Sequence, residues 1–186
     1  MKFRQKTQAE DMSMIRLVRL TADEWPRLRA LRLRSLLDSP DAFGATYEEA
    51  LARKPDGWMQ QVRDLPCFVA VCDDHGDVGL VRYLPDKERR DTAWLISMWV
   101  APDARRLGVG GLLIDAIIDH ARAEGVARLL LEVADHNVAA IALYAKKGFN
   151  ATGDTGGMPA PREHIREHRR ALLLDATRIS EIPGAR

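Results

Sequence analysis

Hydrophobic residues along the chain follow two spacings, one typical of strands and one typical of helices. Short apolar runs bounded by Gly, Pro or Asp predict strands, whereas apolar residues three or four positions apart predict helices. We expect strands over residues 15–20, 67–72, 78–83, 94–100, 128–133, 149–152 and 168–174. We expect helices over residues 23–38, 47–53, 58–64, 108–124 and 137–147. This order predicts one α/β domain with mixed strand pairing.

The composition narrows the classes of partner. The chain has 186 residues, of which 46% are hydrophobic and 30% charged, and its net charge is +1. Without a basic surplus we expect neither nucleic acid nor an anionic membrane as a partner. The two cysteines, Cys67 and Cys72, would face opposite sides of one strand and stay free, which suits a reducing cytosol.

The sequence contains no recognisable targeting signal. The first residues are polar, and no apolar run approaches the ~18 residues of a membrane helix. We therefore expect a cytoplasmic protein, with a disordered leader at residues 1–13, the domain at residues 14–176 and a tail at residues 177–186.

A glycine-rich segment follows the strand expected at residues 94–100 and opens the next helix. It contains Arg105, Gly108, Gly110 and Gly111. The first N–H groups of a helix lack intrahelical partners and the helix dipole is positive there, so an anion fits at this end. Glycines let a diphosphate approach the main-chain amides directly. Arg105 would add a mobile positive charge at the rim.

Three interpretations of these glycines compete. A dinucleotide fingerprint needs G-x-G-x-x-G, and Leu113 stands where its third glycine belongs. A P-loop needs Lys and then Ser or Thr after the glycines, and neither follows here. A turn without a ligand stays open on the glycines alone. The spacing R-x-x-G-x-G from Arg105 to Gly110, preceded by Val100 and Pro102, favours a ligand.

Two sequence blocks together resemble the GNAT (GCN5-related N-acetyltransferase) superfamily. The family's cofactor loop, R/Q-x-x-G-x-G/A, matches residues 105–110. Its next block, N-x-x-A-x-x-L-Y-x-x-x-G-F, matches residues 137–149. Both blocks stand in the family's order and together cover about residues 94–152. One departure is Arg106, at a variable position where glycine is common.

The resemblance implies a fold and a cofactor. The fold is a single GNAT-like α/β (α+β) domain, in which a mixed, mostly antiparallel sheet of six to seven strands is flanked by helices and splayed between its fourth and fifth strands. The cofactor is acetyl-CoA, with coenzyme A as product, and its pantetheine arm lies along residues 94–100 as an added strand would. The residues implied to bind it are Met98, Trp99, Val100, Arg105, Arg106, Leu107, Gly108, Val109, Gly110, Gly111, Asn137 and Tyr144.

The resemblance also implies N-acetyltransfer to a primary amine by direct attack in a ternary complex, which needs two proton transfers. Tyr144 matches the family tyrosine that donates a proton to the sulfur, and its alternative role is a core tyrosine. Glu132 interrupts a buried strand that should be apolar. It matches a glutamate linked to base catalysis in the family's ribosomal-protein alanine acetyltransferases. Two alternatives stay open. Glu132 could be an edge glutamate that is hydrogen-bonded to nearby backbone or to Asn137, or the proton could leave through a water relay without a single base.

The acceptor is less defined than the cofactor. In the family, acceptor contacts come from segments that correspond to residues 33–47 and 153–168. Acidic residues in the first could attract an ammonium group, and arginines in the second could attract a carboxylate or phosphate, but charge alone chooses no substrate. We expect a small-molecule or peptide amine as acceptor, no metal, and a monomer or homodimer. A non-catalytic acyl-CoA-binding sensor is the rival class, because one fold hosts both.

Overall fold

The computed structural model describes residues 15–174. The expected leader at residues 1–13 and tail at residues 177–186 lie outside these residues, as do both expected domain boundaries. Within the described part of the chain, no helix is long and apolar enough to cross a membrane.

Seven strands form one sheet in the order β1-β2-β3-β4-β5-β7-β6. Their bounds are β1 Ile15–Arg19, β2 Cys67–Cys72, β3 Gly76–Pro85, β4 Thr92–Val100, β5 Arg128–Ala134, β6 Asn150–Gly157 and β7 Arg166–Leu173. Neighbouring strands run antiparallel except β4 and β5, which are parallel. The prediction of a mixed, mostly antiparallel sheet in one α/β domain is therefore confirmed.

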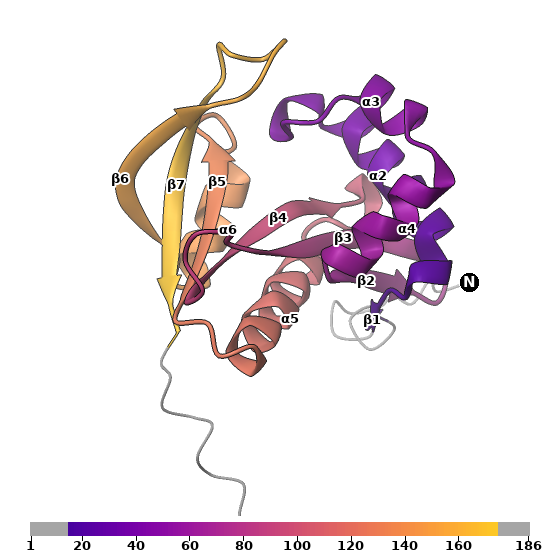
Figure 1. Cartoon of the computed structure of the whole chain (residues 1–186), viewed down its shortest axis with the longest axis horizontal. Helices are drawn as coiled ribbons and strands as arrows, with labels where there is room; N and C mark the ends of the chain where they lie inside the picture. Colours follow the sequence, from indigo (N-terminus) through magenta and orange to yellow (C-terminus); the bar gives the residue numbers. More distant parts are fainter. Residues whose placement is uncertain (1–14, 175–186) are drawn as a thin grey trace, which may run out of the picture.

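Helices cover both faces of this sheet (Figure 1). Their bounds are α2 Trp25–Asp38, α3 Tyr47–Ala52, α4 Pro55–Asp64, α5 Val109–Ala123 and α6 Val138–Lys146, with 3-10 turns η1 Ala22–Glu24, η2 Pro40–Ala42 and η3 Pro102–Ala104. One face of the strands β1 to β4 packs against α5. On the other face α2 packs with α3 and α4 and contacts β3.

The helical apolar spacing seen in the sequence supplies the core. On α2, Leu28 and Leu31 are 0% and 1% exposed, and Trp58 of α4 is 0% exposed. On α5, Leu113 and Ile117 are both 0% exposed against the opposite face of the sheet. Each such side chain stabilises the fold by roughly 1.5–3 kcal/mol, so the position of α5, and of the loop before it, is firmly set.

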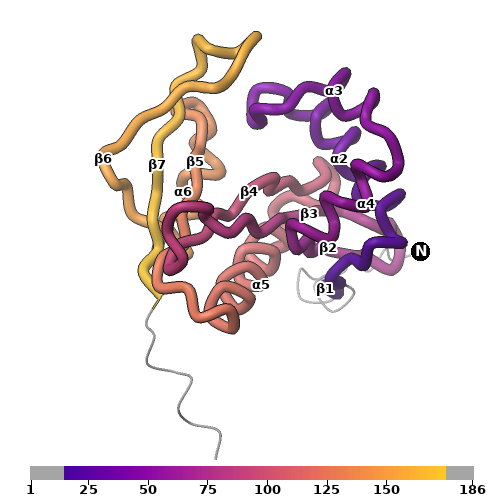
Figure 2. The backbone as a smooth tube through the Cα atoms, viewed as in Figure 1, coloured from indigo at the N-terminus to yellow at the C-terminus, as the bar shows by residue number. Residues whose placement is uncertain are grey.

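The sheet parts between β4 and β5. These strands pair at Thr92, Ala93 and Trp94 and then separate, which confirms the predicted splay. Figure 1 shows the two strands starting side by side and running apart, and Figure 2 shows the same divergence in the backbone trace. A bulge helps β4 to bend away, because the β3–β4 register shifts between Leu80 and Arg82 and Ser97 has a φ of 55°.

Two predicted elements have different end residues in the structure. We expected Pro55 to precede a helix beginning at Trp58, but α4 begins at Pro55 itself, where a missing N–H costs nothing. We also expected the strand that begins at residue 149 to end at residue 152, whereas β6 continues to Gly157. Its register against β7 shifts around Gly153, whose φ is 89°, so the strand passes this glycine through an irregularity.

Candidate active site

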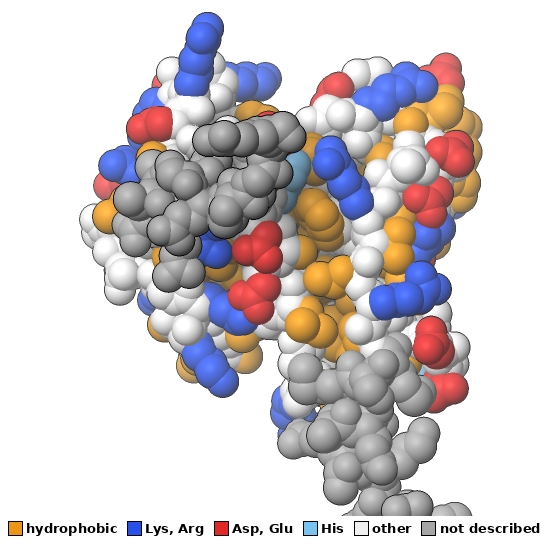
Figure 3. All heavy atoms as spheres, turned by 90° about the horizontal axis from the view of Figure 1, so that it is seen from below, with side chains coloured by type: hydrophobic (Ala, Val, Ile, Leu, Met, Phe, Trp, Pro, Cys, Tyr) orange, Lys and Arg blue, Asp and Glu red, His pale blue; other side chains and the backbone are white. Residues whose placement is uncertain are grey.

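A cleft of about 1000 Å³ lies where β4 and β5 separate. One wall is β4 from Trp94 to Val100, and the opposite wall includes Glu132 of β5. The N-terminus of α5 and the inner face of α6 close one end, and residues of the α2–α3 and β6–β7 loops line the rest. From below, hydrophobic side chains gather in the hollow between the two halves of the molecule, with charged side chains along its borders (Figure 3).

The glycine-rich loop presents main-chain amides to this cleft. Arg106 has a φ of 67°, and Gly108, the N-cap of α5, has a φ of 83°. Left-handed residues in such a turn aim successive N–H groups at one point and form an anion-binding concavity. The first amides of α5 add the positive end of a 15-residue helix. Arg106, Gly108, Gly110 and Gly111 all line the cleft.

Gly110 has a packing role that sequence reasoning missed. A Cβ atom at this position would lie 2.9 Å from Cδ2 of Leu143 and 3.3 Å from Cε of Met98. A side chain there would force the ends of Leu143 and Met98 to shift. The glycine therefore lets these side chains of α6 and β4 pack closely against α5, in addition to leaving the amides uncovered.

Arg105 is anchored instead of standing free at the rim as we expected. Its Nε donates to the carbonyl of Val100 at 3.0 Å, and its guanidinium forms an ion pair with Asp38 of α2. Asp38 also accepts from the indole Nε1 of Trp99 at 2.8 Å. Burial alone would raise the pKa of Asp38, but hydrogen bonds from Ser39 and Trp99, together with Arg105, lower it below its usual value.

Two of the twelve residues expected to bind the cofactor do not line the cleft. Val109 is 1% exposed and belongs to the core, and Leu107 packs against the same core. Both are apolar residues of the loop, so they hold it against the sheet while their neighbours face the cavity. The other ten line the cleft.

Tyr144 and Asn137 are positioned by α6. Asn137 caps the helix, accepting from the amide of Ala140 at 3.2 Å, and its side chain lines the cleft. Tyr144 lines the cleft as well but is only 6% exposed, and its ring meets that of Phe149 edge to face at 5.9 Å. Burial raises the pKa of Tyr144 well above its usual value, so its hydroxyl keeps its proton at neutral pH.

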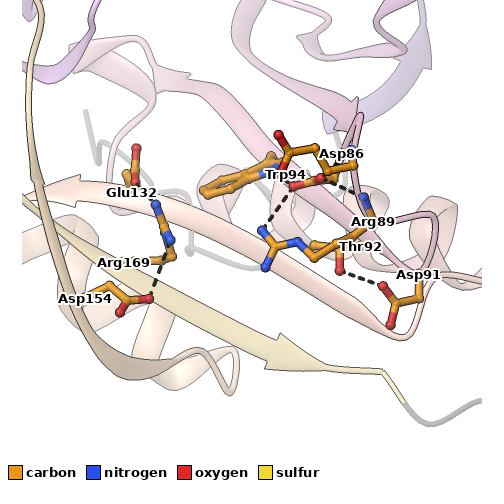
Figure 4. A network of polar contacts seen from close by, with 9 residues as sticks. Asp86, Arg89, Asp91, Thr92, Trp94, Glu132, Asp154 and Arg169 are labelled. Carbon is orange, nitrogen blue, oxygen red and sulfur yellow. Dashed lines mark hydrogen bonds and ion pairs between the residues drawn. The ribbon is translucent and has the colours of Figure 1, made fainter.

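Glu132 faces the cleft from β5 and is held by an arginine. Arg169, directly opposite on β7, donates to Oε1 of Glu132 at 2.8 Å and reaches Asp154 at 3.5 Å (Figure 4). Its guanidinium also lies 5.0 Å from the ring centre of Trp94. The partner of Glu132 is therefore Arg169, and neither the local backbone nor Asn137, which we had considered.

Three charged residues of the cleft region have positions that the sequence did not indicate. Of these, Asp38 was considered only among the acidic residues of the segment 33–47 that could attract an ammonium group. Glu167 lies two residues from Arg169 on β7, lines the cleft and has a raised pKa, first because of burial and then because of Glu132. Arg32 of α2 also lines the cleft and is buried, and Asp38 anchors Arg105. The period-two pattern of β7 could have indicated Glu167, because residues opposite one another share a face.

The two loops at the acceptor end of the cleft are joined to each other. Arg162 of the β6–β7 loop donates to the carbonyls of Gly44 and Ala45 at 3.0 and 3.2 Å. Pro159 of the same loop packs closely on Gly44. A Cβ atom added to Gly44 would lie 3.3 Å from the ring of Pro159. The segments expected to contact the acceptor therefore form one continuous rim.

The model of the Acetyltransferase (GNAT) family matches residues 25–149, about two thirds of the chain and most of the cleft wall. The chain belongs to the GNAT family. Among curated GNAT relatives, the ribosomal-protein-alanine N-acetyltransferase of Escherichia coli is 48% identical over 60 residues, which is 32% of this chain and 40% of that protein. The chain thus spans less than half of that relative's length.

Solved GNAT structures share the fold. An acetyltransferase of Streptococcus pneumoniae superposes with a TM-score of 0.75 at 20% identity, covering 87% of this chain and 99% of the other. An acetyltransferase of Salmonella typhimurium, solved with its cofactor acetyl-CoA, gives a TM-score of 0.71 at 18% identity, covering 87% of this chain and 94% of the other. These likenesses concern the architecture, including the parted sheet.

Proposed function

We propose that this GNAT protein is an N-acetyltransferase that transfers the acetyl group of acetyl-CoA to a primary amine of a small molecule or peptide, by direct attack in a ternary complex. The observation that carries the proposal is the continuity of the cleft, which joins the amides of the glycine loop to Tyr144 and Glu132 in one cavity. An anion site alone would fit many ligands. An anion site that leads to a buried proton donor and a carboxylate fits acyl transfer from a phosphate-bearing donor.

The residues of the cleft fit this donor. The left-handed turn at Arg106 and Gly108 offers amides to a pyrophosphate. Beyond Trp94, β4 has no partner on the β5 side among residues 15–174, so its main-chain groups are open to an extended arm lying along Met98 and Val100. Acetyl-CoA would supply an acyl thioester at the inner end of this path.

Two proton transfers need help from the protein. In the first, the ammonium form of the acceptor loses a proton. The amine nitrogen then bonds to the carbonyl carbon as the carbon–sulfur bond breaks, and in the second transfer the departing thiolate gains a proton. The extra proton left on the new amide nitrogen returns to the proton donor, directly or through water. We assign the second transfer to Tyr144, which is buried, neutral and on the cleft wall. A positioned acid of this kind contributes about 10²–10⁴-fold in rate.

We assign the first transfer to Glu132, directly or through water. The carboxylate faces the cleft, and the hydrogen bond from Arg169 fixes its direction while leaving Oε2 free of any partner among the described residues. Glu167, which also lines the cleft and whose pKa is raised first by burial and then by Glu132, is a second proton acceptor near it. Both carboxylates would also attract the incoming ammonium.

A release assay decides between an enzyme and a non-catalytic acyl-CoA sensor. The full chain is mixed with acetyl-CoA and pooled amines, comprising amino acids, amino acid amides, polyamines and short peptides, and free thiol is followed with a chromogenic reagent. We expect amine-dependent thiol release with saturation in both substrates and no covalent acetyl-enzyme. If calorimetry shows micromolar binding of acetyl-CoA but no amine causes thiol release, the protein is a non-catalytic sensor and not an enzyme.

We also infer a cytoplasmic location, which the two free cysteines support. Cys67 is fully buried and Cys72 partly exposed, and neither forms a disulfide. Burial raises the pKa of the Cys67 thiol to about 12, so it stays protonated and unreactive. A reducing cytosol would keep both cysteines as thiols.

A further inference from the structure

A buried guanidinium without an acidic partner lies in the wall of the cleft. Arg32 of α2 is 7% exposed and lines the cavity beside Phe43. Its Nη1 makes one long hydrogen bond, 3.4 Å to Oγ of Ser35, and its carbon Cζ lies 4.3 Å from the ring centre of Phe43. Within residues 15–174, no carboxylate forms an ion pair with it.

This arrangement differs from that of other arginines around the cleft. Arg105 pairs with Asp38, and Arg169 pairs with Glu132. Burial lowers the pKa of Arg32, and the positive charges of Arg82, 4% exposed on β3, and of Arg53 lower it further. An ionic side chain is rarely buried unless it is paired, so a missing anion is the natural complement of this cluster.

Arg32 can reach such an anion. Phe43 covers one face of the guanidinium, which leaves the planar edge for an in-plane partner. Some buried side-chain nitrogens among the described residues are fully enclosed and have no hydrogen-bond partner, for example Nε of Arg82. No nitrogen of Arg32 belongs to this group. The Arg32 nitrogens without a hydrogen bond are therefore not fully enclosed, and Arg32 is one of the residues that line the cleft.

We propose that the acceptor carries an anionic group, a carboxylate or a phosphate, in the same molecule as its amine, and that Arg32 binds this group. The inference rests on the proposed acetyltransferase function and names its substrate class. Arg32, Glu132 and Tyr144 line one cavity, so an amine near the two catalytic groups and an anion at Arg32 can belong to one small molecule. Free amino acids and phosphorylated amines have this character, whereas the amine end of a peptide does not.

The test compares acceptors that differ in the anion alone. Alanine, methionine and phenylalanine are set against their carboxamides, and phosphoethanolamine against ethanolamine, with kcat/KM measured for each. The enzymes are the wild type, Arg32→Met, and Arg29→Gln as a control on the same helix outside the cleft lining. The preference of an enzyme is the ratio of its kcat/KM for the anionic member of a pair to its kcat/KM for the neutral member. Comparing this ratio between enzymes cancels differences in amine basicity.

We expect the wild type to prefer the anionic member of at least one pair. The amino acid pairs and the phosphoethanolamine pair tell a carboxylate from a phosphate. Arg32→Met should lower the preference by about 10- to 100-fold, the usual loss for a hydrogen-bonded charge pair. It should leave kcat/KM for neutral amines and the Kd of acetyl-CoA within about threefold. Arg29→Gln should keep the wild-type preference.

Two results would overturn the proposal: an unchanged preference in Arg32→Met, or a wild type that favours the neutral amides. If no amine is acetylated by any enzyme, the proposed function fails by itself. Arg32 is then judged by thermal shifts with benzoate and with inorganic phosphate, which should stabilise the wild type but not Arg32→Met. If Arg32→Met does not fold, Arg32→Lys replaces it. The lysine keeps the charge without the planar fork, so it should retain part of the preference.

Discussion

Asp38 offers the sharpest test of how the cleft is held together. Its carboxylate ends α2 and accepts from the indole of Trp99 on β4 and from Arg105 of the glycine loop. It thereby joins the helix that leads to the acceptor loop with the two elements proposed to bind acetyl-CoA. The perturbation is Asp38→Ala, with Asp41→Ala as a control, because Asp41 is an exposed aspartate one short turn further along the chain.

The two contacts of Asp38 contribute unequally. Trp99 is 5% exposed, so its indole N–H would lose its partner in a buried place, which costs about 1–3 kcal/mol. The Arg105 side chain is 45% exposed, so solvent screens its ion pair and we assign it about 0–1 kcal/mol. Asp38→Ala should therefore destabilise the domain by about 1–4 kcal/mol and lower Tm by roughly 2–16 °C.

Urea unfolding and calorimetry measure this loss, and a double-mutant cycle shows where it arises. In a Trp99→Phe background, Asp38→Ala should cost less than half as much, because no indole N–H is left unpaired. In an Arg105→Ala background the cost should stay nearly unchanged. The lowered pKa of Asp38 means that its contribution is present above about pH 4 and fades as the pH falls through the lower folded-state value. Equal unfolding midpoints for Asp38→Ala and Asp41→Ala at pH 7 would refute the reasoning.

Four other variants probe the chemistry and the packing. Tyr144→Phe should lower kcat by about 10²–10⁴-fold and leave the Kd of acetyl-CoA within threefold, and unchanged turnover would exclude the donor role. Glu132→Gln should remove or shift the acidic limb of the pH profile of kcat/KM; an unaltered limb would point to another base or to water. Gly110→Ala should cost about 1–3 kcal/mol in urea unfolding, because its Cβ would lie 2.9 Å from Leu143. Gly111→Ala, which meets only the flexible end of a lysine at 3.4 Å, should be near neutral.

The parts of the site that are local in sequence were predictable. Residues 105–110 form a loop and a helix start whose arginine and glycine spacing is typical of an anion site, and the parted sheet followed from the resemblance that this loop supports. Asn137 caps α6 as its position before an apolar helix suggested. Such features depend on backbone conformation and on neighbours a few residues away, which a sequence displays directly.

The parts that depend on distant partners were not predictable. Asp38 and Arg105 are separated by 67 positions, and Glu132 and Arg169 by 37. Each pair forms because the sheet order brings two segments together, and many exposed charges could have filled either role. Arg32 is buried whereas Arg34 on the same helix is exposed, and nothing local in the sequence distinguishes the two arginines.

The contact between Arg162 and the carbonyls of Gly44 and Ala45 changes how access to the cleft should be pictured. The strands β4 and β5 pair as far as Trp94, and the α2–α3 and β6–β7 loops, one from each half of the molecule, are joined again by this arginine at the acceptor end. The two halves therefore form a ring around the cavity, and not an open jaw hinged at one end. A ring admits what fits its aperture, so the width between these two loops, more than any swing of the sheet, would limit the size of the acceptor.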